Sequence, residues 1–162
     1  GHTVFLSVRH GADSVCIARH LGSDPIQVLS IDVGARRPLG ASVSGIALLA
    51  GLPPAEARAL TQRNAQRLQG AGRTVAQVLA AAEACRAHGH TYAPEGVMPG
   101  TSALAVPLRD AAGGVVGAVS IAALADRLTR ERVRGAVARM QEQVALVSQR
   151  LGEIERARNR RR

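Results

Sequence analysis

Apolar residues recur along the last third of the chain with a spacing that alternates between four and three. The pattern covers about three heptads, at Val133, Val137, Met140, Val144, Val147, Leu151 and Ile154. It predicts one long amphipathic helix that begins after Thr129, and the rest of the chain must provide a surface that covers its apolar stripe. That surface is either a second helix in a coiled coil or a β-sheet of the same domain. Three heptads are near the lower limit for a coiled coil, so both remain open.

Strand patterns occur on both sides of a helical middle section. Alternating or β-branched runs predict strands over residues 3–9, 14–20, 27–33, 101–109 and 115–122, with hairpin connections at 10–13 and 110–114. Residues 34–39 read as a loop. Helices are predicted from Ser42 or Ser44 to Gly51, from Pro54 to Leu68 and from Thr74 to Gly89. This order predicts an α+β fold in which helices flank a central antiparallel sheet.

Composition excludes several functions. The 162 residues suffice for one domain with its own core, and all 21 basic residues are arginine, against 12 acidic ones. Without lysine there is no Walker A loop, no Schiff base and no Ser-Lys dyad. Phe5 and Tyr92 are the only aromatic residues, which argues against base stacking on single-stranded nucleic acid. Cys16 and Cys85 are too far apart for a zinc ribbon, and no run is long enough to span a membrane, so we expect a cytoplasmic domain.

An enzymatic interpretation is weaker than a structural one at each candidate residue. Gly40 to Ser44 nearly matches the nucleophile elbow Gly-x-Ser-x-Gly, but Ser44 stands where the second glycine is needed. Ser42 and Ser44 are better explained as helix caps. His88 and His90 lack neighbouring metal ligands. Cys85 lies on the apolar stripe of its predicted helix and Cys16 lies inside a predicted strand, so both are better explained as core residues than as reactive thiols. We therefore expect no catalytic residue, no metal and no cofactor.

Several ordered blocks of residues resemble one family. They are GARRPLGASVSGIALLA at 34–50, AVPLRD at 105–110, GVVGAVSI at 114–121, and the closing Leu128-Thr129 and Ser148-x-x-Leu151-Gly152. Together they resemble the effector-binding domain of IclR-type bacterial transcriptional regulators. The chain departs from the family pattern at Gly40, where histidine is usual, and at Ile46, where lysine is usual.

The resemblance implies a GAF-like domain that binds a small metabolite and forms homodimers or homotetramers. In this family a winged helix-turn-helix at the amino end contacts operator DNA, and this chain has no room for one before its first strand. Gly1-His2 looks like a cleavage remnant, so we expect a longer natural protein. We assign residues 3–155 to the effector-binding domain and 156–162 to a basic tail.

The resemblance also implies a ligand site. Family members hold small acids with backbone groups at a helix start, an aspartate, a cysteine and two serines. Carried over by the motif blocks, with Arg37 added at the mouth, these positions are Val43, Ser44, Ala93, Ala103, Ser120, Ala122 and Arg37. Three polar positions have become alanine, so we expect a wider, more apolar pocket and an aromatic or hydrophobic carboxylate as effector. Ser120 is equally well explained as a hydrogen-bonded strand serine.

Two other functions remain open. The three alanines are also consistent with an oligomerisation module that has no small-molecule ligand. The arginines near the carboxyl end, within residues 153–162, would permit weak, salt-sensitive and sequence-independent nucleic-acid binding.

Overall fold

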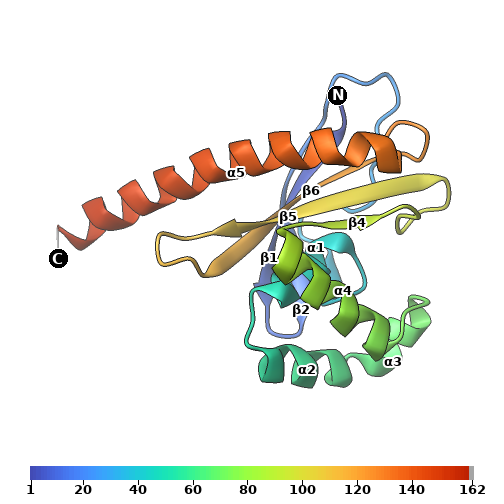
Figure 1. The fold of residues 1–162 in the computed structure, drawn as a ribbon, viewed down its shortest axis with the longest axis horizontal. Coiled ribbons are helices and arrows are strands. Elements are labelled where there is room, and N and C mark those ends of the chain that lie inside the picture. Colours follow the sequence, from blue (N-terminus) through green and yellow to red (C-terminus); the bar gives the residue numbers. More distant parts are fainter. Residues whose placement is uncertain (161–162) are drawn as a thin grey trace.

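The structure is a computed structural model that describes residues 1–160, and it confirms the predicted α+β fold. Six antiparallel strands form one sheet in the order β3-β2-β1-β6-β5-β4 (Figure 1). The strands are β1 (Thr3–His10), β2 (Asp13–His20), β3 (Arg36–Pro38), β4 (Thr91–Ala93), β5 (Thr101–Arg109) and β6 (Val115–Leu124). The helices are α1 (Val43–Ala50), α2 (Pro54–Arg63), α3 (Ala65–Gly70), α4 (Val75–His88) and α5 (Arg130–Asn159).

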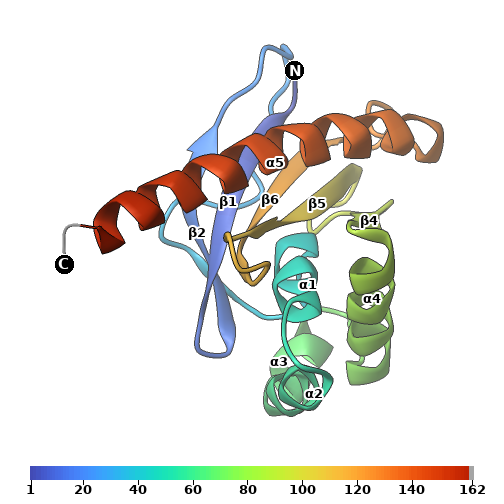
Figure 2. The ribbon, with the colours of Figure 1, turned by 60° about the vertical axis from the view of Figure 1, so that its left-hand side comes forward.

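Strand register divides the sheet into two differently covered faces. Phe5 of β1 lies opposite Ser120 of β6, and Leu6 lies opposite Val119. Because successive side chains point to opposite faces, the first pair faces one side and the second pair the other. Helices α1 and α4 lie on the side of Ser120, and α5 crosses the side of Val119 (Figures 1 and 2). The domain thus has a helical layer on each face of its sheet.

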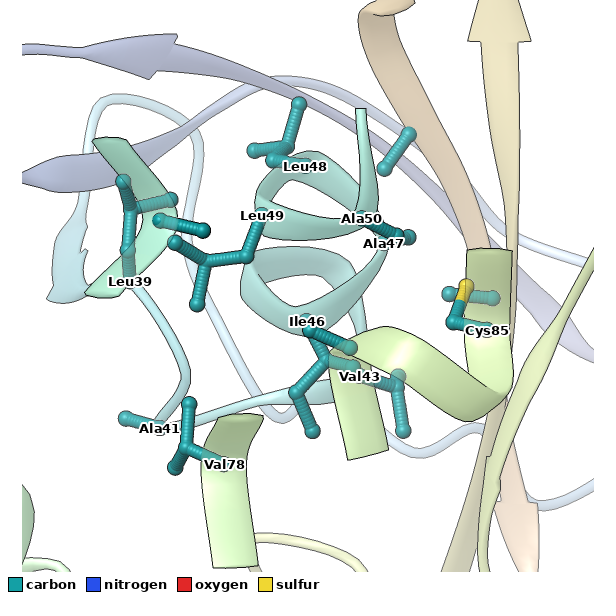
Figure 3. Packing of buried hydrophobic residues seen from close by; sticks show 14 of the residues in the cluster. Leu39, Ala41, Val43, Ile46, Ala47, Leu48, Leu49, Ala50, Val78 and Cys85 are labelled. Atoms are coloured by element: carbon teal, nitrogen blue, oxygen red, sulfur yellow. The ribbon is translucent and has the colours of Figure 1, made fainter. Parts of the chain in front are cut away.

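Helix α1 is the centre of the first layer. All eight of its residues are buried, as expected for a helix that is apolar all round (Figure 3). It packs between the sheet and α4. The segment that leads into α1 passes so close to α4 that position 40 must be a glycine. Gly40 has φ +97°, and a Cβ there would lie 2.4 Å from Cγ1 of Val78. The family's usual histidine would therefore not fit this backbone.

The heptad stripe of α5 has two parts. Val133, Val137 and Val144 are buried, and they pack on the face of the sheet that carries Leu104 and Leu108. For this half of the helix, the sheet of the same domain is the correct partner. Farther along, Leu151 still packs against the cluster of Leu108 and Val144. Val147 is 45% exposed and Ile154 is 64% exposed, so these two positions of the stripe are uncovered in the single chain.

Four elements differ from the sequence prediction. Residues 27–33 form no strand; Val28 instead packs against Phe5 and Cys16 without a ladder. A short strand, β3, lies inside the predicted loop 34–39, and β4 was missed because three residues show no alternation. The helix predicted from Pro54 to Leu68 is interrupted at Asn64, whose Nδ2 donates a hydrogen bond to the carbonyl of Ala12 at 2.7 Å.

The sequence signals for helix ends agree with the structure better than these predicted elements do. The hydroxyl of Ser42 caps α1 by accepting from the amide of Gly45 at 3.3 Å. Thr74 and Gln77 form a reciprocal capping box on α4, and Gly89 ends that helix with φ +73°. Thr129 precedes α5 as predicted, but its side chain makes no capping hydrogen bond.

The cysteines and the basic tail complete the comparison with the sequence. Both cysteines are buried, and burial raises the pKa of the Cys85 thiol to about 11, which suits a core residue rather than a nucleophile. Helix α5 continues through Arg156 and Arg158, while Arg161 and Arg162 lie outside the described residues.

No helix within residues 1–160 combines the length and apolar character that crossing a membrane requires.

Candidate functional site

A cavity lies between the sheet and the start of α1. All seven residues expected at the ligand site line it: Arg37, Val43, Ser44, Ala93, Ala103, Ser120 and Ala122. They come from β3, α1, β4, β5 and β6, so segments far apart in the sequence meet here. About 40 Å³ of its interior is open to the centre of a water-sized molecule. One water needs roughly 10–15 Å³ of such space, so the cavity has room for a compact ligand.

Two serines meet at the inner end of this cavity. Ser44, the second residue of α1, donates from its hydroxyl to the hydroxyl of Ser120 on β6 at 2.9 Å. Their residues are only 6% and 5% exposed. Ser42 alone caps the helix, so the sequence interpretation of Ser44 as a cap is wrong. A hydroxyl at the second helical position turns toward the sheet, and Ser120 provides the partner that a buried hydroxyl needs.

The three alanines form one row across the sheet. Ala93 of β4 lies opposite Ala103 of β5, which in turn lies opposite Ala122 of β6. Directly opposed residues point to the same face, so the three methyl groups make a continuous apolar floor below the start of α1. Ser120, two residues before Ala122, continues the same face. The positions that carry polar groups in small-acid sensors are therefore neighbours in this structure.

The walls are more polar than the alanines alone suggested. Half of the eighteen lining residues carry a polar side chain, including six serines. The serines are Ser7, Ser14, Ser30, Ser42, Ser44 and Ser120. The larger apolar side chains in the lining are Phe5, Ile31, Val43, Val97 and Ile121. The cavity thus combines an apolar floor with hydroxyl groups around it and arginine at its edge.

Comparison with known proteins identifies the chain. A family model described as the bacterial transcriptional regulator IclR C-terminal matches residues 1–149. The chain belongs to the IclR family. Its members are transcriptional regulators rather than enzymes, and the matched region is their C-terminal effector-binding domain. No curated protein is significantly similar to the chain.

Solved structures agree with this assignment to the IclR family. A transcriptional regulator from Rhodococcus sp. RHA1 is 31% identical, with a TM-score of 0.83, over 94% of this chain and 62% of that chain. The IclR protein of Thermotoga maritima is 26% identical, with a TM-score of 0.77, over 93% and 61% of the two chains. HmgR of Pseudomonas aeruginosa is 27% identical, with a TM-score of 0.75, over 93% and 59%. The chain spans about three-fifths of the length of these relatives.

Several residues lining the cavity of this IclR-type domain were not predicted. Arg73 lies in the connection between α3 and α4, where neighbouring glycines indicate only a turn. Ser7 could have been found, because it shares the face of Phe5 in the predicted first strand. Ser14 and Ser30 depend on how β2 and the irregular segment after it fold back, which no local pattern reports.

The serine pair gives a test of this geometry. We expect Ser44→Ala or Ser120→Ala to lower the free energy of unfolding by about 1–3 kcal/mol, because each leaves the other hydroxyl buried without its partner. The double variant should lose less than the sum of the single losses. Urea denaturation measures all three, with the exposed Ser23→Ala as control. Additive losses would show that the hydroxyls do not depend on each other.

Proposed function

We propose that this IclR-type domain senses a carboxylic acid with an aromatic or branched aliphatic body. The observation that carries the proposal is the cavity between the alanine row and the amino end of α1, because it combines apolar surface with groups suited to an anion. Pockets for small molecules are mostly apolar and contain a few polar groups that fix orientation.

The anionic end of the ligand would bind at the start of α1. The first amides of a helix have no acceptor within the helix, and the helix dipole adds a partial positive charge there. The amides of Val43 and Ser44, together with the hydroxyls of Ser44 and Ser120, can then receive a carboxylate. Arg37 at the edge of the cavity adds a formal positive charge.

The body of the ligand would lie over the alanine floor. Methyl groups at Ala93, Ala103 and Ala122 leave space that longer side chains would fill, and Phe5 and Ile31 border it. Burial of apolar area stabilises by about 25 cal/mol per Å², so a ring or a branched chain gains more than a two-carbon acid. The open space limits that body to a compact one.

Binding measurements test the proposed function. In calorimetry we expect benzoate and branched aliphatic acids to bind more tightly than glyoxylate or pyruvate. A ligand at about 100 times its dissociation constant should add roughly 2.7 kcal/mol to the free energy of unfolding. Tighter binding of glyoxylate or pyruvate would contradict the proposal.

An oligomerisation module without a small-molecule ligand is the second candidate. It is favoured by the exposed apolar side chains of Leu146, Val147 and Ile154 on the outer half of α5. A homodimer or homotetramer would cover them. If none of the acids binds while the chain self-associates, this second function is the better account.

We further infer the setting of the domain in a full regulator. Residues 3–155 would form the effector-binding unit and 156–162 a basic tail, in a cytoplasmic protein whose winged helix-turn-helix contacts the operator. The support for the additional DNA-binding domain is the share of the related regulators that this chain covers.

A further inference from the structure

Two arginines from different layers line the same cavity. Arg37 belongs to the edge strand β3, and Arg73 precedes α4 in the helical layer. Both are partly buried. No aspartate or glutamate is among the residues that line this cavity in the described part of the chain. The cavity edge therefore carries two positive charges without a carboxylate in the lining to balance them.

Few of the guanidinium N–H donors of Arg37 and Arg73 are used within the protein. Nη2 of Arg37 donates to the carbonyl of Ser30 at 2.8 Å. This hydrogen bond orients the guanidinium and leaves its other N–H donors available to a ligand. Within residues 1–160, none of the ion pairs involves Arg37 or Arg73. Glu95 borders an adjoining hollow that Arg73 also borders, yet the two side chains form no ion pair. Arg73 is thus a charged group at the cavity that is not committed to a protein partner.

We propose that the ligand is a dicarboxylate and that Arg73 binds its outer carboxylate. This rests on the proposed function, in which the start of α1 and the two serine hydroxyls receive the inner carboxylate. A guanidinium group matches a carboxylate with two parallel hydrogen bonds, and charge-assisted bonds are about twice as strong as neutral ones. A monoacid would leave the outer end of the cavity positively charged.

The size of the cavity limits the spacing of the two carboxylates. With about 40 Å³ open to the centre of a water-sized molecule, the body between them is one ring or a short chain. Matched pairs of probes follow from this: benzoate against isophthalate and terephthalate, and pentanoate against glutarate. Each pair keeps the body similar and adds the second carboxylate.

Calorimetry at constant ionic strength tests the inference. We expect at least one diacid to bind the wild-type chain at least tenfold more tightly than its matched monoacid. Arg73→Gln should reduce that preference to less than threefold, because it should cost the diacid more affinity than the matched monoacid. Arg73→Lys keeps the positive charge but lacks the two parallel N–H donors of a guanidinium group, so it should retain part of the preference for the diacid. The exposed Arg58→Gln on α2 serves as control, with circular dichroism to confirm folding of each variant.

The outcomes separate this inference from the proposed function. If monoacids bind as tightly as diacids, or if Arg73→Gln weakens both classes equally, the role of Arg73 is wrong while the carboxylate site remains. If Glu95→Gln removes the diacid preference as fully as Arg73→Gln, Arg73 does not bind the ligand's carboxylate directly. If no acid binds, the proposed function fails, and the dicarboxylate proposal fails with it.

Discussion

Val137→Asp is expected to unfold the domain, whereas Val147→Asp on the same stripe of α5 is expected to leave it folded. Val137 is buried in the cluster that contains Leu104, Ile121 and Leu128. A carboxylate placed there loses hydration without gaining a partner, which costs several kcal/mol out of a total stability of about 5–15 kcal/mol. Val147 is 45% exposed, so a carboxylate at that position keeps its water.

Urea denaturation followed by circular dichroism measures both variants. We expect Val137→Asp to lose at least about 4 kcal/mol or to be unfolded without denaturant, and Val147→Asp to stay within about 1 kcal/mol of wild type. Light scattering adds a second readout, because Val147→Asp should weaken self-association if a second copy covers the outer half of α5. Equal destabilisation by the two variants would show that the whole stripe is core.

Ala103→Leu is expected to abolish ligand binding. Ala103 is the middle residue of the row formed with Ala93 and Ala122, and a leucine there projects into the small open space above the floor. We expect at least a hundredfold loss of affinity for the tightest acid of the panel. Overpacking of a site with free volume should cost the fold no more than about 1–3 kcal/mol.

The control for this variant is Ala59→Leu, an exposed position on α2. It adds the same side chain far from the alanine row, so both stability and binding should stay close to wild type. Unchanged binding in Ala103→Leu would contradict the assignment of the cavity as the ligand site. Loss of binding in both variants would point to an effect on the whole domain.

Local signals predicted the parts of the fold that local chemistry determines. The hairpin between β1 and β2 was predicted from its turn, where Gly11 has φ +62°. Ser42 and Thr74 were predicted to cap α1 and α4 because their hydroxyls accept from amides within the first turn. Such interactions involve residues only a few positions apart, so a sequence pattern records them directly.

The sequence did not correctly predict elements whose structure depends on contacts with distant residues. Residues 27–33 have the composition of a strand, but Val28 is fixed by packing on Phe5 and Cys16 rather than by a ladder. The break at Asn64 depends on the carbonyl of Ala12, which lies fifty-two positions earlier. Tertiary contacts decided both cases against local propensity.

The candidate site shows the same division. Motif blocks located Val43, Ser44 and Ser120 because these residues lie inside recognisable runs. Arg73 lies in a connection without periodicity, and it reaches the cavity only because α4 packs beside α1. The resemblance also could not show that the three alanines are neighbours, since that follows from the register of β4, β5 and β6.

Methyl NMR on the chain labelled with ¹³C at alanine methyl groups tests the central claim most directly. Titration with benzoate should shift the methyl signals of Ala93, Ala103 and Ala122 in a saturable way. The exposed Ala59 and Ala138, on α2 and α5, should remain unshifted at saturation. Saturable shifts confined to methyl groups away from the alanine row would contradict the account, as would the absence of saturable shifts with every acid of the panel.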